Sequence, residues 1–593
     1  MLHWLIEHSL KQRLLICVFT IGLLFAGWTA YQTIPIDAFP DVSSTQVKII
    51  IKSPGMTPEE VEARITAPIE VEMLGIPRQT SLRAVAKYAL TDITIDFEDG
   101  TDIYWARQQV TERLNNAWAN LPPEVSGGIA PMTTPLGEMF MFTIESDTLS
   151  LQEKRTLLDW VIRPRLRTVP GVADVNALGG LVRSFEIVPD NARLQARGIA
   201  LNDLQTALSE NNHNDGAGRL KDGEESLLVR AEGAFKTLDD IRNPVIKGQQ
   251  GSPVRIADIA DVRIGELTRY GAVSRNGKGE AVEGLVLGLR GANARQVVEG
   301  VRAKLVEIKP SLPKDVKIEV FYDRGNLVDR AVHTVNKALM EAVVLVLILL
   351  VLFLGNLRAA LTVACALPLA MLATFWLMQR YGMSANLMSL GGLAIAIGML
   401  VDSAVVVVEN IVEHLAHAPE NQGKLAVILA AMREVSVPVS AGIVIIITVF
   451  LPLLTLQGLE GKLFAPVALS IMFALGSSLL LSLTIIPVLA SFLIKNQSNE
   501  DPWLIRHLNR WYASSLTSAM QHKRIVLLAA VVLLVLTGLV YPFIGKTFMP
   551  TMDEGDVIIG TEKLPSIALS QSIATDSHLQ QTLLQQVPEV QGV

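Results

Sequence analysis

The stretch LMSLGGLAIAIGMLVDSAVVVVE, residues 387–409, decides how this chain is interpreted. It has the apolar composition and length of a membrane-spanning helix, which needs about 17–25 residues, yet Asp402 lies inside it. A carboxylate near mid-bilayer costs roughly 2.5–3.5 kcal/mol on insertion scales, so such residues are rare and usually serve proton relays or ion pathways. Glu409 follows seven residues later, nearly on the same helical face and about 10 Å further along the axis. The pair indicates proton handling; the alternative is a structural carboxylate paired with a basic residue of another helix.

The composition of the whole chain agrees with a membrane protein. Of its 593 residues, 50% are hydrophobic and 18% are charged, and the mean hydropathy is +0.37, which excludes an ordinary soluble protein of this size. Lysine and arginine gather in the short loops of one side, which is therefore expected to be cytoplasmic. Apolar runs of spanning length predict seven membrane helices, at residues 14–31, 338–354, 359–378, 387–409, 436–456, 464–494 and 525–544.

These spans divide the chain into six segments. They are a membrane anchor, a large exported domain, a group of membrane helices, a cytoplasmic amphipathic segment, a last membrane helix and the start of a second exported domain. In that order they cover residues 1–33, 34–335, 336–496, 497–524, 525–544 and 545–593. Cys17 and Cys365, the only cysteines, fall in predicted membrane helices, which excludes a disulfide in the exported parts. The net charge of −7 argues against a nucleic-acid partner.

The exported domain alternates period-2 strands with period-3.6 helices, so it is expected to be an α+β domain. A strand at 47–51 leads into a helix that Thr57 and Glu60 open as a capping box, and extended segments and a second helix follow. This βαββα order is typical of a ferredoxin-like βαββαβ module. A second such module begins at residues 139–144, which indicates an internal duplication.

A larger repeat spans the whole chain. Lys11-Gln12-Arg13, an apolar helix and Phe39-Pro40-Asp41 are echoed by Lys523-Arg524, an apolar helix and Phe548-Met549-Pro550. Membrane transporters are often two repeats in one polypeptide, so the sequence is expected to be half of a two-repeat transporter plus the start of its second half. The alternative is that residues 545–593 form a short finished tail.

Seven motifs carry a resemblance to a known family. They are IPIDAFPD (34–41), FEDGTDIYWARQQVTERL (97–114), PLGEMF (135–140), RTVPGVADVNALGG (167–180), YDRGNLVDRAV (322–332), LVDSAVVVVEN (400–410) and MPTMDEGD (549–556). Together they resemble the resistance-nodulation-division efflux pumps, specifically their heavy-metal branch, over essentially the whole chain. The resemblance implies a proton-driven exporter of metal cations in a bacterial inner membrane, with a large periplasmic domain. It also implies a homotrimer when complete, and a tripartite assembly with a periplasmic adaptor and an outer-membrane channel.

The same resemblance assigns roles to the membrane acids. Asp402 matches the proton-relay aspartate of the family, and Glu409 matches a nearby glutamate implicated in the metal branch. Multidrug members usually carry a second aspartate directly after the first, and this chain has Ser403 there. Some zinc and cobalt exporters carry another aspartate six residues upstream, where this chain has Ala396. Asp402 is thus the only deep carboxylate that the motif retains.

The predicted metal ligands are Glu138, Asp174 and Glu554, which match acidic positions of zinc-exporting relatives. The copper and silver branch carries a methionine where this chain has Gly560. Soft thioethers suit Cu(I) and Ag(I), whereas carboxylates suit harder divalent ions, so the expected substrates are Zn²⁺, Co²⁺, Cd²⁺ or Ni²⁺. The alternative for each acid is an ordinary solvated surface position.

The sequence also has to be compared with functions other than metal export. An exporter of organic compounds needs a roomy aromatic pocket, which 6% aromatic residues do not suggest. An inactive truncated half, or a non-transporting membrane subunit in contact with lipid, follows if no second half exists. An enzyme is disfavoured, because the sequence shows no phosphate-binding glycine-rich loop, Ser-His-Asp arrangement or ATP motif. No bound cofactor is expected: the metal is the transported substrate and the proton is the coupling ion.

Overall fold

The computed structural model describes residues 2–593 except 38–39, 250–251, 420–421, 495–502 and 546–555. Contacts divide the chain into two compact units. Unit 1 comprises Met1–Gly137, Gly288–Glu299 and Asp323–Ile559, and unit 2 comprises Glu138–Leu287, Gly300–Tyr322 and Gly560–Val593. Unit 1 therefore contains the apolar helices together with the first strand-rich module, and unit 2 contains the second.

The apolar helices of unit 1 agree with the prediction of a membrane protein. The described residues contain six helical stretches long and apolar enough to cross a membrane: Arg13–Thr33, Leu357–Arg380, Leu387–His417, Lys424–Thr455, Gly458–Leu493 and Lys523–Phe543. The apolar part of a further helix, Met340–Phe353, is shorter than this length. The count of seven spans therefore stays a prediction.

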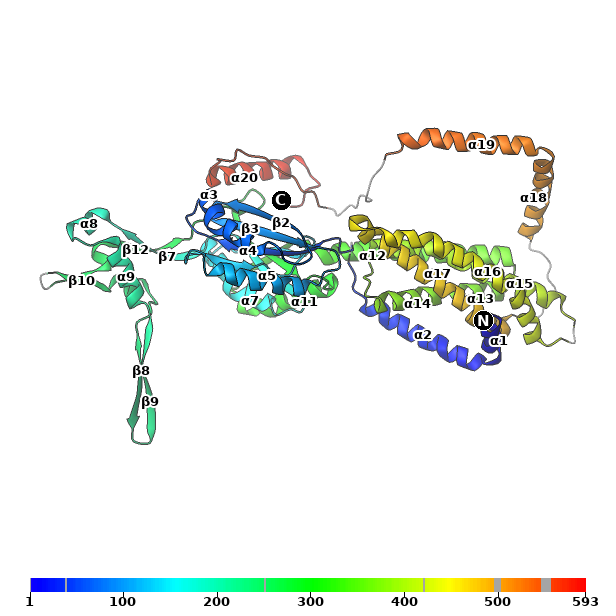
Figure 1. Cartoon of the computed structure of the whole chain (residues 1–593), viewed down its shortest axis with the longest axis horizontal. Coiled ribbons are helices and arrows are strands. Elements are labelled where there is room, and N and C mark those ends of the chain that lie inside the picture. Colours follow the sequence, from blue (N-terminus) through cyan, green and yellow to red (C-terminus); the bar gives the residue numbers. More distant parts are fainter. Residues whose placement is uncertain (1, 38–39, 250–251, 420–421, 495–502, 546–555) are drawn as a thin grey trace. The chain divides into compact units, whose positions relative to one another are not determined.

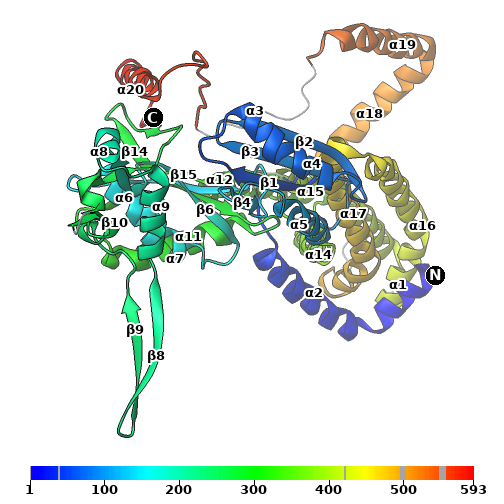
Figure 2. The ribbon, with the colours of Figure 1, turned by 60° about the vertical axis from the view of Figure 1, so that its left-hand side comes forward.

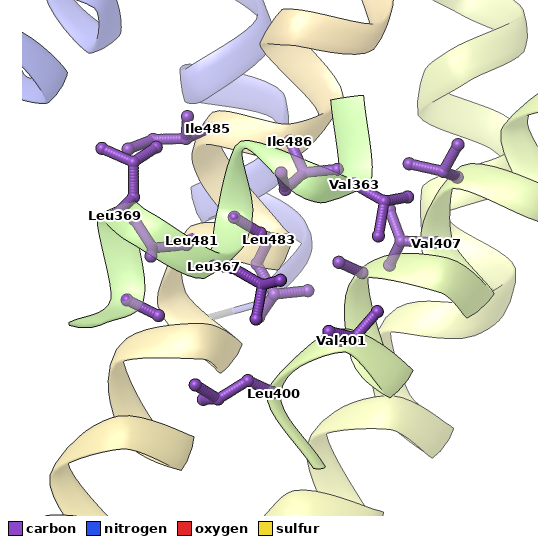
Figure 3. Packing of buried hydrophobic residues seen from close by; sticks show 14 of the residues in the cluster. Val363, Leu367, Leu369, Leu400, Val401, Val407, Leu481, Leu483, Ile485 and Ile486 are labelled. Carbon is purple, nitrogen blue, oxygen red and sulfur yellow. The ribbon is translucent and has the colours of Figure 1, made fainter. Parts of the chain in front are cut away.

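Unit 1 contains the following helices outside its strand-rich module. They are α1 (Leu2–Lys11), α2 (Arg13–Thr33), α12 (Arg324–Leu354), α13 (Leu357–Ala364), α14 (Ala366–Arg380), α15 (Leu387–His417), α16 (Lys424–Phe450), α17 (Gly458–Leu493), α18 (Trp503–Gln521) and α19 (Lys523–Val540). Helices α14, α15, α16 and α17 lie side by side in a bundle (Figure 1). Its apolar core gathers between α13, α14, α15 and α17, as Figure 3 shows for Val363, Leu367, Leu400 and Leu483.

Small residues let these helices approach closely. A Cβ at Gly392 of α15 would lie 2.8 Å from the Val467 carbonyl oxygen of α17, and a Cβ at Gly27 of α2 would lie 2.7 Å from the Leu372 carbonyl oxygen of α14. Close backbone approach of this kind is how helices associate inside a bilayer, where the hydrophobic effect provides no driving force between them. The glycines therefore fix which helices are neighbours.

The strand-rich module of unit 1 has βαββαβ element order. Its strands are β1 (Thr45–Lys52), β2 (Gln79–Lys87), β3 (Leu90–Phe97) and β4 (Ser126–Ile129), and its helices are α3 (Pro58–Val61), the π-helical turn η1 (Glu62–Thr66), α4 (Ala67–Met73) and α5 (Ile103–Trp118). The sheet is antiparallel, in the order β2-β3-β1-β4. The predicted capping box is present: the Glu60 N–H donates to Thr57 Oγ1 at 3.4 Å, and the Thr57 N–H donates to Glu60 Oε2 at 2.9 Å.

The larger module of unit 2 is built around a five-stranded sheet. Its strands are β5 (Glu138–Glu145), β6 (Val172–Gly179), β13 (Val273–Ser274), β14 (Glu280–Gly288) and β15 (Lys317–Asp323); its helices are α6 (Leu151–Leu157), the π-helical turn η2 (Leu158–Ile162), α7 (Arg163–Leu166), α11 (Ala294–Ile308), which continues from unit 1, and α20 (Leu569–Gln586). The order is β13-β14-β5-β15, with β6 paired to β14. The fully buried Phe140 and Phe142 of β5 belong to the core.

A smaller module of unit 2 carries a long hairpin. Its elements are β7 (Arg183–Pro189), α8 (Asn191–Ala196), α9 (Leu201–Asn211), β8 (Asn214–Asp222), β9 (Glu225–Glu232), α10 (Leu238–Arg242), β10 (Val245–Gln249), β11 (Ser252–Arg255) and β12 (Ala260–Glu266). Strands β7 and β12 form an antiparallel pair that leads in and out of this module. The hairpin β8–β9 projects from it into solvent, as Figure 2 shows, and nearly all of its residues are exposed.

Candidate functional site

One face of α15 is exposed over its length. The exposed residues recur every three or four positions, which is the spacing of a single helical stripe: Ile395, Gly398, Asp402, Val406, Glu409, Glu413 and His417. Asp402 and Glu409 lie on this stripe, in line with their seven-residue spacing. The stripe also carries Glu413, which the motif does not predict as a functional residue. The α15 stripe thus presents three carboxylates, of which Asp402 lies in the apolar part of the helix.

Ser403 lies on the opposite side of α15, against α17. Only 5% of Ser403 is exposed, and its hydroxyl lies 3.1 Å from the hydroxyls of both Ser478 and Ser482. The Ser478 hydroxyl also donates to the Leu400 carbonyl at 2.7 Å. An aspartate at position 403 would therefore be buried between two serines of α17, while Asp402 remains on the exposed stripe.

Helix α15 is held firmly at the end that precedes Asp402. The Asn386 side chain accepts hydrogen bonds from the backbone N–H groups of Met388 and Ser389, both at 3.0 Å, and so caps the helix. The Ser389 hydroxyl in turn accepts from the Asn386 N–H at 2.9 Å. This reciprocal cap fixes the first turn of the helix that carries Asp402.

Glu138 is the first residue of β5 and is exposed. On the neighbouring strand β14 lies Glu283, which is half-buried. Burial raises the pKa of the Glu283 carboxyl above its ordinary value, and the negative charge of Glu138 raises this pKa further. Glu283 was not among the predicted site residues, although a lone acid between the apolar pairs Ala281-Val282 and Leu285-Val286 is a visible signal in the sequence.

Asp174 of β6 is engaged by two arginines. The Arg163 guanidinium lies 3.0 Å from Asp174 Oδ2, and Arg167 Nε lies 3.3 Å from Oδ1. The Val175 N–H also donates to Oδ1, at 2.7 Å. Only 14% of the Asp174 side chain is exposed. A cation could bind Asp174 only by displacing one of these partners.

The three predicted metal ligands are not assembled in the described residues. No group of three or more His, Cys, Asp or Glu side chains there is arranged to hold a metal ion. Glu554 lies outside the residues that the structure describes. The three-acid site therefore stays a prediction. Glu283 lies on the strand next to Glu138 but opposite Thr143, whereas Glu138 lies opposite Leu287.

Comparison with known proteins identifies the family. The family model described as the AcrB/AcrD/AcrF family matches residues 5–593. The chain belongs to the AcrB/AcrD/AcrF family. This confirms the resemblance to resistance-nodulation-division transporters, which are transporters and not enzymes.

Relatives of this AcrB/AcrD/AcrF member place it beside heavy-metal pumps. It is 40% identical to the cobalt-zinc-cadmium resistance protein CzcA of Cupriavidus metallidurans, with 99% of the chain and 57% of that relative covered. It is 36% identical to the cation efflux system protein CusA of Escherichia coli, with 100% of the chain and 58% of the relative covered. The crystal structure of a heavy metal efflux pump matches with a TM-score of 0.84 and 34% identity, over 99% of the chain and 57% of that structure. The chain therefore spans a little over half the length of these relatives.

Proposed function

We propose that the chain is the N-terminal part of a proton-driven exporter of divalent heavy-metal cations. The α15 stripe carries this proposal, because Asp402 lies on the exposed face of an otherwise apolar, membrane-length helix. The names of the relatives support metal cations as the substrates, since CzcA is named for cobalt, zinc and cadmium, and NccA of Alcaligenes xylosoxydans xylosoxydans for nickel, cobalt and cadmium. The proposed location is a bacterial inner membrane, with the strand-rich modules in the periplasm.

Protonation of Asp402 changes which surface the α15 stripe can contact. The ionised carboxylate requires a basic or hydrogen-bonding partner inside the bilayer, because an unpaired charge there is costly. The protonated carboxyl no longer needs that partner, so proton uptake and release favour two different packings of α15. Each proton that moves down a membrane potential of 100 mV supplies about 2.3 kcal/mol. We assign Glu409, two turns closer to the cytoplasm, to proton passage between Asp402 and that side.

The oxygen ligands proposed for the cation are Glu138, Glu554 and Asp174. Glu283 is a further acid on the neighbouring strand β14: it lies opposite Thr143, whereas Glu138 lies opposite Leu287, and the charge of Glu138 adds to the effect of burial in raising the pKa of Glu283. A divalent cation bound near Glu138 would favour the ionised form of that carboxyl. A trimer, a periplasmic adaptor and an outer-membrane channel complete the proposed pump.

The test is a chromosomal Asp402→Asn variant in the organism that encodes the chain. Asparagine keeps the shape of the side chain and removes the titrating group, so we expect export of zinc or cobalt to fall more than tenfold at normal abundance in the membrane. Asp402→Glu, which keeps a titrating group, is the matched control and should retain part of the activity. Unchanged metal resistance in the asparagine variant would remove Asp402 from the mechanism.

A further inference from the structure

The segment that follows α2 is bonded to the segment that precedes α15. Ile36 and Ala385 form a parallel β-bridge. The Asp37 N–H donates to the Ala385 carbonyl at 3.2 Å, and the Ala385 N–H donates to the Pro35 carbonyl at 2.8 Å. Because Ala385 directly precedes the cap of α15, any axial displacement of this helix moves Asp37 with it.

Asp37 is in turn bound by Arg324, the first residue of α12. The Arg324 guanidinium donates to Asp37 Oδ1 from Nη2 at 2.8 Å and from Nε at 3.1 Å, and Arg324 is only 5% exposed. An ion pair in which a buried guanidinium makes two hydrogen bonds has a defined geometry, which a lysine with its single ammonium cannot reproduce. The third arm of the guanidinium, Nη1, donates to the Leu136 carbonyl.

Leu136 lies in the turn that leads into β5. The Gly137 N–H donates to the Thr134 carbonyl at 2.8 Å, and the Gly288 N–H donates to the Gly137 carbonyl at 2.8 Å. A Cβ at Gly137 would lie 2.9 Å from the Thr134 oxygen, so the turn leaves no space for a side chain. The next residue is Glu138. A displacement of Leu136 is therefore passed to the first residues of β5 through a short, tightly bonded turn.

We propose that Arg324 is a positioning residue that transmits movement of α15 to the start of β5. The route runs from Asp402 along about 25 Å of helix to Ala385, then through Asp37 and Arg324 to Leu136. It uses two backbone hydrogen bonds and one buried guanidinium. The inference rests on the proposed function for the event that moves α15, and it adds the link by which protonation reaches the strand that begins with Glu138.

The test is hydrogen–deuterium exchange of the full chain in lipid nanodiscs, resolved over residues 137–142. Asp402→Asn imitates the protonated carboxyl, and we expect it to change the exchange rates of these amides at least threefold. Adding Asp37→Leu, which removes the acceptor oxygen, or Arg324→Met should abolish that response. Asp99→Asn is the matched control: it removes the Lys462–Asp99 ion pair of 2.6 Å, which joins α17 to the first strand-rich module, and should leave the response intact.

Two outcomes would overturn the proposal. One is a response at residues 137–142 that persists without the Asp37–Arg324 pair. The other is no response to Asp402→Asn when that pair is intact. Asp37→Leu keeps a similar side-chain volume and removes the acceptor oxygen, so it decides the question if Arg324→Met lowers the amount of folded protein. Metal export is measured separately, and normal export in Asp402→Asn would refute the proposed function. The exchange data alone test whether the Asp37–Arg324 pair transmits movement to the start of β5.

Discussion

Asp402 lies on the exposed α15 stripe, two helical turns before Glu409. Its spacing to Glu409 predicted a shared helical face, and both lie on the exposed α15 stripe. The partners of Asp174 could not be predicted in this way. Arg163 and Arg167 are close to it in sequence, but α7 and β6 must first pack before the guanidinium groups reach the carboxylate. Local periodicity determines a face, whereas an ion pair depends on tertiary packing.

At Glu409 we predict a milder effect than at Asp402. Glu409→Gln should lower proton-coupled metal export less than threefold, because this acid lies two turns nearer the carboxyl end of α15 and the carboxyl of Asp402 remains. Proton uptake by proteoliposomes that contain the complete transporter measures the difference. Equal losses in the Asp402→Asn and Glu409→Gln variants would instead show one coupled site with shared titration.

We predict that the Glu283 carboxyl makes the stability of the folded protein depend on pH. Because burial and Glu138 raise the pKa of this carboxyl in the folded state, the folded form holds its proton more tightly than the unfolded form. The resulting stabilisation is fully present at acidic pH and is lost as the pH rises through the raised pKa. In metal-free buffer, Glu283→Gln should therefore raise the apparent melting temperature by a few degrees at pH 7 and leave it nearly unchanged at pH 4. An equal shift at both pH values would show that charge is not the cause.

At the scale of elements, the sequence predicted where helices are capped and which runs are helical. It did not predict where a helix becomes irregular. Thr57 and Glu60 form the predicted capping box, and the apolar run at 387–409 became the core of α15. The π-helical turns η1 and η2 were not predicted. Each is followed within two residues by a proline, Pro68 or Pro164. Proline cannot donate to the preceding turn, and a π-helical turn accommodates the missing bond, but the sequence alone does not say whether a helix widens or breaks there.

The contact between α15 and α17 supports a prediction with an internal control. Gly392→Ala places a Cβ 2.8 Å from the Val467 carbonyl, so the helices must separate, and we expect a destabilisation of about 1–3 kcal/mol. Gly391→Ala, one residue earlier, meets no atom within 4 Å and should be neutral. Thermal unfolding of both variants in detergent measures the difference in stability. Equal stability would mean that α17 shifts to make room for the added methyl group.

At the scale of the whole molecule, the sequence predicted a membrane transporter but not the grouping of its parts. The first strand-rich module groups with the helices of unit 1, and residues 560–593 group with the second module in unit 2. The Gln580 side chain donates to Ser274 Oγ at 2.9 Å, across 306 residues of sequence. Such pairings come from long-range packing, which no local pattern encodes.

At this scale we predict which metal cations the complete transporter selects. Oxygen ligands should favour Zn²⁺ or Co²⁺ over Ag(I), and calorimetric binding should weaken as falling pH protonates the carboxylates. Glu138→Ala should weaken divalent binding at least fivefold. Glu145→Ala, at the other end of β5 and already 3.4 Å from Arg275, is the matched control and should not. Tight Ag(I) binding without a divalent signal would reverse the proposed metal class.

The close approach of α2 and α14 also has a consequence for biosynthesis, because the two helices are synthesised at different times. Gly27 lies against Leu372, and the bridge between Ile36 and Ala385 joins the same two regions of the chain. At about 5–20 residues per second, a ribosome needs about 20–70 s to add the residues that separate these partners. During that interval the glycine face of α2 has no helix to pack against. A newly inserted α2 is therefore exposed to membrane quality control until α14 emerges, and a bulky residue at position 27 would extend that exposure indefinitely.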